Sequence, residues 1–495
     1  MPPARSYGPR EGLFRRRNLA LAALAFFFFV AHPSVRTSPS RLLKSRYKRP
    51  PKPPQSQAAV AYWAAEVAPD TRIQPVLADL YVERQKRRAE AVAHAQARGL
   101  RLNDRTRESD APVVVYWSEP PYWWKKEYGT GQGEHIQVDN CPVKCTLVSG
   151  HSNDTAQRDA HVVMEYNTHR NRIDGLPATG PRSLRPWQKA ALYSMEANSV
   201  LENHLDLLKL FDIFSHFSAY SDIRFETYIP NMCDDPEDAN SHCIGLPDVT
   251  SRAVADRWWG KDRTKSPFFD EQLAAQAPLP TGEVRLATFI SNCYGSTRNR
   301  LIRELVEEGI VFDHYGKCKE DVFGGVPQNY SAKISALVKP DPDSPSQKLR
   351  WQAKMKILAM YPFVLILENT ILSDYISEKI TQGILAGGIP IILGAPNLAS
   401  EIDPPTAPHP PLYIDAMDYT PSELAAHLRR LAAEPALHAE YRAWTKTLPD
   451  APVVEYARRT SDNNYLENGL MRPICDICQY YHENYDWETQ APVAF

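Results

Sequence analysis

Two short apolar runs flank a helical pattern between residues 361 and 397. Phe363 to Leu367 and Ile389 to Leu393 are apolar throughout, which is typical of buried parallel strands. Between them, Ser377 is a suitable N-cap for a helix, and Gly387-Gly388 ends it because glycine adopts a left-handed C-cap without strain. A strand, a helix and a strand within about 30 residues predict a βαβ unit with a right-handed crossover.

Lys379 falls in the first turn of this predicted helix. A cation at that place opposes the helix dipole. Ligands of βαβ units lie beyond the carboxyl ends of the strands, where the free N–H groups of a helix N-terminus bind phosphate. We therefore interpret Lys379 as facing a bound anion, while the pattern alone leaves open a solvated lysine on a surface helix.

Further strands and helices follow from the same periodicities. Apolar and β-branched runs predict strands at residues 112–117, 161–166, 190–195, 284–290 and, from its start, 310–312. Helices are expected at residues 296–309 and 347–360 and after the capping box Thr420 to Glu423. Residues 73–99 also have a helical pattern with a mixed-charge face, which predicts a solvated helix or one that packs at the edge of the first domain, and we assign no chemistry to it.

The chain begins with a basic, then an apolar, then a second basic segment. Residues 19–31 form an uninterrupted apolar run, shorter than the ~20 residues of a typical membrane span. Basic residues dominate positions 1–18 and 33–57, and the latter segment is also rich in proline. The run is either a short membrane anchor or the core of a cleaved signal peptide, and both place the following residues in the secretory lumen.

The charge and the acidic motifs of the chain favour neither a nucleic-acid-binding site nor a metal site. The formal net charge of −2 gives no indication of nucleic-acid binding. Asp341-Pro-Asp343 has the Asp-x-Asp form of a metal site, but it lies in a Pro/Ser-rich loop rather than at a strand end, so we expect no metal there. Asn153 and Asn329 are candidate N-glycosylation sites.

The eight cysteines are even in number, which in a lumenal protein indicates disulfides. Pairing of sequence neighbours is our prediction, namely Cys141–Cys145, Cys233–Cys243, Cys293–Cys318 and Cys475–Cys478. A zinc site at Cys475-Asp-Ile-Cys478 lacks a second ligand pair at suitable spacing. A redox motif there would stand at a helix start after a strand rather than in a chain tail.

The stretch 361–397 resembles the signature of the alpha-1,3-fucosyltransferase family. The resemblance rests on Glu368-Asn369, Asp374-Tyr375, Ser377-Glu378-Lys379, Ala386-Gly387-Gly388 and Gly394-Ala395-Pro396-Asn397. It extends to Ser194-Met195-Glu196, Tyr220-Ser221-Asp222, Ser291-Asn292 and Arg298, and so covers residues 140–478 roughly. We claim no counterpart in the family for residues 1–104.

For the fold, the resemblance implies an α/β protein of the GT-B arrangement, two Rossmann-like domains facing a cleft, with an N-terminal anchor and stem. The predicted parts are a cytoplasmic tail (1–18), an anchor or signal peptide (19–32), a stem with a linker helix (33–104), an N-terminal acceptor domain (105–278), a C-terminal GDP-fucose-binding domain (279–478) and a tail (479–495). The family often ends in a Cys-x-x-Cys, which supports the pairing of Cys475 with Cys478. Family members are typically single-pass type II Golgi membrane proteins with lumenal catalytic domains, which favours the anchor.

For function, the resemblance implies inverting transfer of L-fucose from GDP-fucose to a GlcNAc hydroxyl, in alpha-1,3 linkage, of a glycoprotein N-glycan or related oligosaccharide. Glu196 would be the general base, because a carboxylate in a cleft can be desolvated toward a working pKa. Arg298 and Lys379 would stabilise the departing GDP. Asn369, Tyr375 and Glu378 would hold the nucleotide sugar, Glu378 through sugar hydroxyls.

Several alternatives stay open at this point. No cofactor or metal is expected beyond the donor substrate, and stimulation by a divalent cation is undecided. Another GT-B nucleotide-sugar transferase and a non-catalytic lumenal glycan-binding protein are the two other classes. The sequence does not reveal whether the acceptor is the N-glycan core or a Lewis-type GlcNAc. The linkage position and the oligomeric state are equally open.

Overall fold

The structure is a computed structural model of the 495-residue chain. It describes residues 55–97, 112–117, 135–138, 141–149, 160–166, 188–194, 205–224, 266, 268–293, 295–318, 329–338, 348–402, 411–441 and 472–485. Several sequence predictions lie outside these ranges: the N-terminal tail and anchor, Glu196, Asn153, Cys233, Cys243 and the Asp341-Pro-Asp343 segment. Within them, no helix is both long and apolar enough to cross a membrane.

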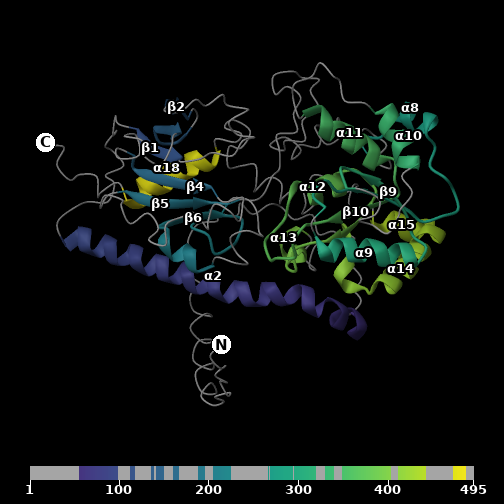
Figure 1. Cartoon of the computed structure of the whole chain (residues 1–495), viewed down its shortest axis with the longest axis horizontal. Helices are drawn as coiled ribbons and strands as arrows, with labels where there is room; N and C mark the ends of the chain where they lie inside the picture. The colour runs from purple at the N-terminus through teal and green to yellow at the C-terminus, as the bar shows by residue number, and fades with distance from the viewer. Residues whose placement is uncertain are drawn as a thin grey trace, which may run out of the picture. The chain divides into compact units, whose positions relative to one another are not determined.

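The described chain is built around two sheets that are almost wholly parallel (Figure 1). The first has the order β2-β3-β1-β4-β5-β6-β7, and only β2 pairs antiparallel with its neighbour. Its strands are β1 (Val113–Trp117), β2 (His135–Gln137), β3 (Cys145–Ser149), β4 (Val162–Tyr166), β5 (Lys189–Tyr193), β6 (Ile213–His216) and β7 (Ile223–Arg224). The predicted α/β class with two parallel-sheet domains is confirmed.

The second sheet has the order β12-β11-β10-β8-β9 and is parallel throughout. Its strands are β8 (Arg285–Phe289), β9 (Val311–Tyr315), β10 (Phe363–Leu367), β11 (Ile389–Leu393) and β12 (Ile414–Asp415). The two apolar runs of the sequence are β10 and β11 residue for residue, and they pair in register from Phe363–Ile389 to Leu367–Leu393. Both are buried on both faces, which explains their continuous rather than alternating hydrophobicity.

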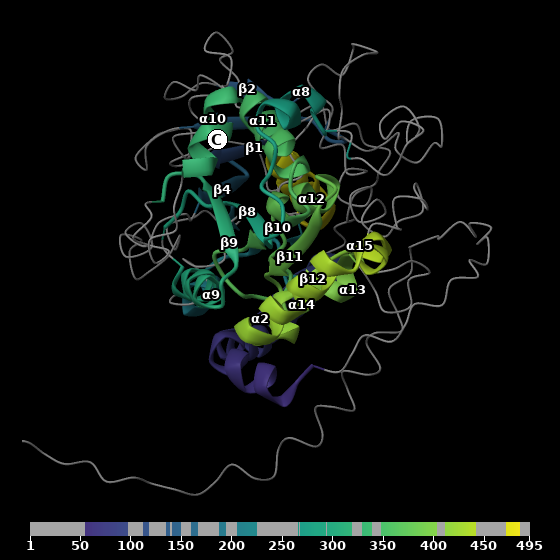
Figure 2. The same cartoon turned by 90° about the vertical axis from the view of Figure 1, so that its right-hand side faces the viewer.

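Helices cover both faces of the second sheet (Figure 2). Val364 and Ile366 face a core with α8 (Glu271–Gln276), α10 (Asn329–Leu337), α11 (Lys348–Ala359) and α12 (Glu378–Leu385). Phe363, Leu365 and Leu367 face a core with α9 (Ser296–Glu307) and α14 (Pro421–Ala433). The remaining elements on this side of the chain are α13 (Leu398–Ile402), η3 (Ala416–Asp418) and α15 (Pro435–Tyr441).

The helix ends follow the local sequence signals. Ser377 caps α12 by accepting a hydrogen bond from the Lys379 N–H, and Gly387 beyond the helix has a φ of 89°. Thr420 and Glu423 form the predicted capping box of α14. A Cβ at Gly388 would lie 2.5 Å from the Tyr361 carbonyl oxygen, so only glycine permits this close approach between the residues that precede β11 and those that precede β10.

The helix α18 (Arg472–Tyr485) packs on the first sheet, although the sequence analysis assigned its residues to the C-terminal domain and the tail (Figure 1). Its buried positions recur at helical spacing: Ile474, Cys475, Ile477, Cys478, Tyr481 and Tyr485. Two disulfides, Cys141–Cys475 and Cys145–Cys478, join it to the start of β3.

These two disulfides correct the predicted pairing of sequence neighbours. Cys475 and Cys478 lie on one face of a helix, and that face points at the sheet, so each sulfur meets a cysteine from the β3 region rather than its neighbour. The prediction for Cys293–Cys318 is confirmed. No cysteine among the residues that the structure describes is free.

The long helix α2 (Gln57–Ala97) departs most from the prediction, which began the helix at residue 73 and placed it in solvent or at the edge of the first domain. It has 41 residues and contains Pro69 and Pro75, which obscured its first half in the sequence because proline usually ends a helix. One face is buried along most of its length, at Ala59, Trp63, Asp70, Ile73, Leu77, Leu80 and Arg84. The helix is therefore part of the core packing.

Candidate functional site

A cavity of about 340 Å³ lies at the carboxyl ends of the strands of the second sheet. Its lining comes from α2, the start of α9 and the ends of β10 and β11: Glu66, Pro69, Gly295, Ser296, Thr297, Glu368, Asn369, Thr370, Ile371 and Leu393. This is the place where open parallel sheets bind ligands. The Thr370 hydroxyl in this lining is buried and has no hydrogen-bond partner among the described residues, so it can receive a ligand group.

Glu368 is the centre of a polar cluster beside this cavity. It follows β10 directly, and its side chain is fully buried. Its carboxylate accepts hydrogen bonds from the N–H of Ser377 at 3.0 Å, from the Ser377 hydroxyl and from Lys379 Nζ at 3.2 Å. The strand end and the N-terminus of α12 are thereby fixed to each other.

Lys379 lies between two carboxylates. Its Nζ is 3.2 Å from Glu368 Oε2 and 3.7 Å from Glu378 Oε1, and it donates to the Ser377 hydroxyl at 2.9 Å. The Lys379 side chain is 28% exposed, so its ammonium is bound by protein groups on one side and accessible to a ligand on the other. Within the protein itself, the nearest negative charge to the Lys379 ammonium is the Glu368 carboxylate.

Arg298 reaches the same cluster from the first turn of α9. It is only 3% exposed, and burial lowers the pKa of its guanidinium, an effect that the neighbouring Glu368 and Tyr375 side chains oppose. A Cβ at Gly295 would lie 2.7 Å from Arg298 Nε, so the absence of a side chain at Gly295 leaves space for the Arg298 side chain. Arg298 and Lys379 thus bring two positive charges to Glu368 from two different helix N-termini.

The loop of residues 369–376 carries two further predicted site residues. Asn369 lines the cavity. Tyr375 is 3% exposed and packs its ring 5.0 Å from that of Phe217, which belongs to the first-sheet side of the chain. Glu378, just after this loop, has a half-buried side chain. The structure therefore gathers five of the six predicted site residues around the ends of β10 and α9, and the sixth, Glu196, lies outside the described residues.

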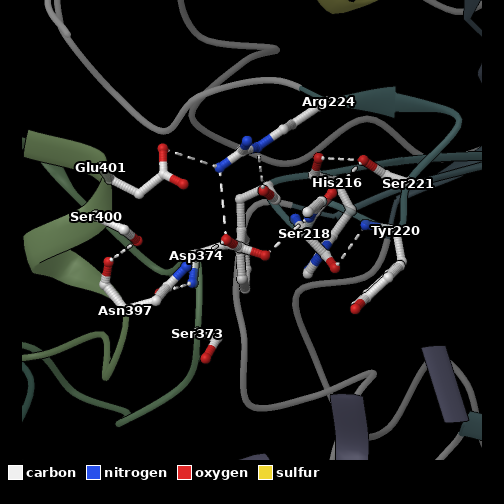
Figure 3. Close-up of polar contacts among 12 residues, drawn as sticks. His216, Ser218, Tyr220, Ser221, Arg224, Ser373, Asp374, Asn397, Ser400 and Glu401 are labelled. Atoms are coloured by element: carbon white, nitrogen blue, oxygen red, sulfur yellow. Dashed lines mark hydrogen bonds and ion pairs between the residues drawn. The ribbon is translucent and has the colours of Figure 1, made fainter. Parts of the chain in front are cut away.

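Asp374 in this loop has a backbone φ of 69°, the left-handed region. Its carboxylate accepts hydrogen bonds from the N–H of Ala219 and from Asn397 Nδ2, both at 2.8 Å. Its own N–H donates to Asn397 Oδ1 at 2.8 Å, and Figure 3 shows Asp374 and Asn397 facing each other. Arg224 of β7 stands 3.5 Å from Asp374 and 3.6 Å from Glu401. Asp374 and Asn397 are both part of the sequence signature, which predicted no role for either residue.

Lys354 was missed altogether because α11 has no motif. Its Nζ donates to Gln382 of α12 at 2.6 Å. Burial lowers the pKa of Lys354 to about 8; Glu378 opposes this effect, Lys379 adds to it and Glu368 opposes it. A third cation, after Arg298 and Lys379, thus lies next to α12.

The carboxyl edge of the first sheet is buried and polar. His216 ends β6, is fully buried and accepts a hydrogen bond from the Ser218 N–H at 3.2 Å. Burial lowers the pKa of His216 to about 3, so its imidazole is neutral at physiological pH. The neighbouring β5 is described as far as Ser194, two residues before Glu196.

At the second predicted N-glycosylation site, Asn329 begins α10 and Ser331 is buried.

No group of three or more His, Cys, Asp or Glu side chains that could hold a metal ion occurs within the described ranges.

Comparisons with known proteins match the C-terminal part of the chain. Residues 281–492 match the family model "Glycosyltransferase family 10 (fucosyltransferase) C-term". An alpha-(1,4)-fucosyltransferase of Arabidopsis thaliana is 28% identical over 151 residues, which are 30% of this chain and 34% of that protein. A GDP-fucose protein O-fucosyltransferase 3 of Danio rerio is 30% identical over 187 residues, 37% of this chain and 34% of that protein.

The chain thus spans about a third of the length of these curated relatives. Among solved structures, a crystal structure of an alpha1,3-fucosyltransferase with GDP has a TM-score of 0.37 at 14% identity, covering 75% of this chain and 95% of that one. A second crystal structure of an alpha1,3-fucosyltransferase also has a TM-score of 0.37, at 16% identity, with 69% and 84% covered.

Proposed function

Because residues 281–492 belong to glycosyltransferase family 10, the fucosyltransferases, we propose that this protein transfers L-fucose from GDP-fucose to a sugar hydroxyl of a glycoprotein glycan. The observation that carries the proposal is the approach of Arg298 and Lys379 to Glu368, from the starts of α9 and α12. Preorganised cations at helix N-termini are what a leaving nucleoside diphosphate requires.

The reaction is a single in-line displacement with inversion at the anomeric carbon. The acceptor oxygen forms a bond to C1 of fucose while the bond from C1 to the β-phosphate oxygen breaks, and GDP leaves with that electron pair. Glu196 takes the proton of the acceptor hydroxyl. Arg298 and Lys379 stabilise the charge that develops on the phosphate oxygens.

Glu368 supports this chemistry by holding its partners before the donor arrives. Its bonds to Ser377 and Lys379 keep the α12 N-terminus and the ammonium in place, so little reorganisation is needed during the reaction. In this proposal Asn369, which lines the cavity, and Glu378 bind hydroxyl groups of the nucleotide sugar. Glu378 accepts from the sugar hydroxyls rather than facing the diphosphate, which would repel it. The ring of Tyr375 packs against the ring of Phe217 and so helps to fix the position of the loop.

The acceptor that we propose is a GlcNAc hydroxyl with alpha-1,3 linkage. The relatives favour a second candidate, a protein hydroxyl, because several of them are GDP-fucose protein O-fucosyltransferases. We also propose that the described domains lie in the lumen of the Golgi, attached by one N-terminal membrane span. Three disulfides support an oxidising compartment.

The test is GDP release by the full chain, produced in the secretory pathway of eukaryotic cells. GDP-fucose, GDP-mannose and UDP-GlcNAc are offered with an N-glycan set and with a folded-protein set, with EDTA and with added Mg²⁺ or Mn²⁺. Glu196→Gln is compared with Glu434→Gln, an exposed carboxylate at the end of α14. Turnover with GDP-fucose alone that is lost only in Glu196→Gln supports the proposal, and the acceptor set that is fucosylated decides between the two candidates. Turnover only with another donor would contradict the proposal.

A further inference from the structure

The helix α2 is attached to the rest of the chain at two places along its length. Near its start, Trp63 is 2% exposed, packs in the core of the second sheet and donates its indole N–H to the Tyr419 carbonyl at 2.9 Å. In the second half of the helix, Arg84 forms a buried ion pair of 2.7 Å with Asp222, which lies between β6 and β7. A helix attached at two such places is held rigidly between them.

The middle of α2 borders the cavity described above. Glu66 and Pro69 belong to the cavity lining. The Glu66 carboxylate accepts a hydrogen bond from the Thr297 hydroxyl and lies 3.1 Å from an Arg300 nitrogen, so it is fixed to the first turns of α9. One wall of the cavity therefore comes from a helix outside residues 281–492, the part that matches the family model.

Asp70, one turn further along α2, binds the loop of residues 369–376. Its Oδ1 accepts a hydrogen bond from the Ser373 N–H and its Oδ2 one from the Ser373 hydroxyl, both at 2.8 Å. Asp70 is 6% exposed, and Gln74 Nε2 donates to it at 2.9 Å. Hydrogen bonds to a buried carboxylate are about twice as strong as neutral ones, so this contact is a firm attachment point for the loop.

The same loop is held on its other side by Asp374, through Ala219 and Asn397 (Figure 3). Leu372 and Tyr375 pack into one apolar cluster with Ile73 and Leu77 of α2. The loop is neither helix nor strand, and a turn within it is closed by a hydrogen bond from the Tyr375 N–H to the Leu372 carbonyl. The position of this turn depends on the lateral contacts, and among the described residues of α2 Asp70 supplies the hydrogen bonds to the Ser373 N–H and hydroxyl.

We propose that α2 is a functional part of the donor site, and that Asp70 is a positioning residue for GDP and GDP-fucose, acting through Ser373 on Asn369 and Tyr375. This inference rests on the proposed function, since it needs a nucleotide to position. It extends that function to a helix that carries no signature residue. The Glu66 wall and the Asp70 attachment together make the cavity incomplete without α2.

The experiment measures the Kd of GDP by titration calorimetry for the intact chain and for Asp70→Ala, Ser373→Ala and the double variant. Asp70→Ala is expected to weaken GDP binding about tenfold or more, the size of effect expected when a well-made charge-assisted contact is lost. Because Asp70 acts through Ser373, the double variant is expected to bind GDP no more weakly than Asp70→Ala alone. An unchanged Kd in Asp70→Ala, or full additivity, would overturn the inference.

Two further variants separate positioning from loss of stability. Asp70→Asn keeps an oxygen for the Ser373 N–H and an amide that can donate to its hydroxyl, so it should recover most of the GDP affinity. Tyr62→Phe removes the 2.6 Å bond from α2 to Glu304, away from the loop, and should lower the melting temperature without changing the Kd. If Tyr62→Phe weakened GDP binding as much as Asp70→Ala, the role of Asp70 would be merely structural and the inference would fail.

The two proposals fail in distinguishable ways. If the unmodified chain does not bind GDP at all, the donor assignment of the proposed function is overturned, and the inference with it. If the unmodified chain binds GDP and Asp70→Ala binds it equally well, only the inference is overturned. If Asp70→Ala does not fold, Ser373→Ala decides, since it keeps the packing of α2: weaker GDP binding in this variant supports the inference, and an unchanged Kd overturns it.

Discussion

The carboxylate of Asp374 accepts a hydrogen bond of 2.8 Å from the backbone N–H of Ala219, 155 residues away in the sequence. Asp374 belongs to the loop after β10, and Ala219 to the turn between β6 and β7. The contact links the loop that carries Asn369 and Tyr375 to the edge of the other sheet. Because Asp374 also has a φ of 69°, its conformation is maintained by these bonds rather than by local preference.

Asp374→Ala is therefore expected to lower the free energy of unfolding by about 1–3 kcal/mol, since donors on Ala219 and Asn397 lose their buried acceptor. Asp374→Asn keeps one acceptor oxygen and tolerates a positive φ, so its loss should be about half as large. Arg224→Ala, which removes only a half-exposed ion partner, should cost about 0–1 kcal/mol. Denaturant unfolding measures all three, and equal losses for the three variants would contradict this account.

A second prediction concerns Lys354, whose pKa burial lowers to about 8. An unfolded lysine has a pKa of about 10.4, so between these two values the unfolded chain binds more protons than the folded one. The free energy of unfolding then rises with pH across this window, and below it both states carry the charge, so the cost of burying the charge is constant. Raising the pH from about 8 to about 10 should thus stabilise the protein through this residue.

The measurement is the free energy of unfolding across that pH range for the unmodified chain and for Lys354→Met, which cannot titrate. The unmodified chain should gain about 1–3 kcal/mol relative to the variant, and other titrating groups cancel in the difference. Lys356→Met is the matched control, because this lysine lies on the same helix and is half exposed. Parallel curves for Lys354→Met and the unmodified chain would refute the prediction.

The second sheet was predictable because its signals are local. Five apolar residues between polar groups defined β10 and β11 to the residue, and Ser377 marked the start of α12 through its own hydroxyl. Glu368, Glu378 and Lys379 follow within a few residues, so their meeting around α12 needed only the crossover geometry of a βαβ unit.

The contacts that were missed are made across the chain. Asp70 binds Ser373 over 303 residues, and Lys354 meets Gln382 from a helix without a motif. The first half of α2 was hidden by Pro69, although Ala59, Trp63 and Asp70 recur at helical spacing. The same spacing of Cys475 and Cys478 with Tyr481 could have shown a buried face, and hence the distant disulfides.

The third prediction concerns those disulfides. Peptide mapping without reduction should recover Cys141 joined to Cys475 and Cys145 joined to Cys478. Replacing Cys145 and Cys478 together by serine should lower the free energy of unfolding by about 2–4 kcal/mol, because each bridge closes a very long loop. Replacing Cys293 and Cys318, which bridge 25 residues, should leave the attachment of α18 intact. A peptide with an internal Cys475–Cys478 bond would contradict the pairing.

The last prediction separates the two roles of Lys379, as the partner of buried Glu368 and as a ligand of the donor phosphates. Lys379→Met leaves the Glu368 carboxylate without its cation, which should destabilise the fold by about 1–3 kcal/mol and abolish GDP binding. Glu368→Gln combined with Lys379→Met removes both charges and should regain most of the stability while GDP binding stays lost. Melting curves and calorimetry on the same samples measure the two effects. Arg430→Met, which removes an exposed cation of α14 that pairs with Glu434, is the control and should change neither strongly. Recovery of GDP affinity in the double variant would mean that Lys379 is only a structural partner of Glu368, and that Arg298 alone faces the phosphates.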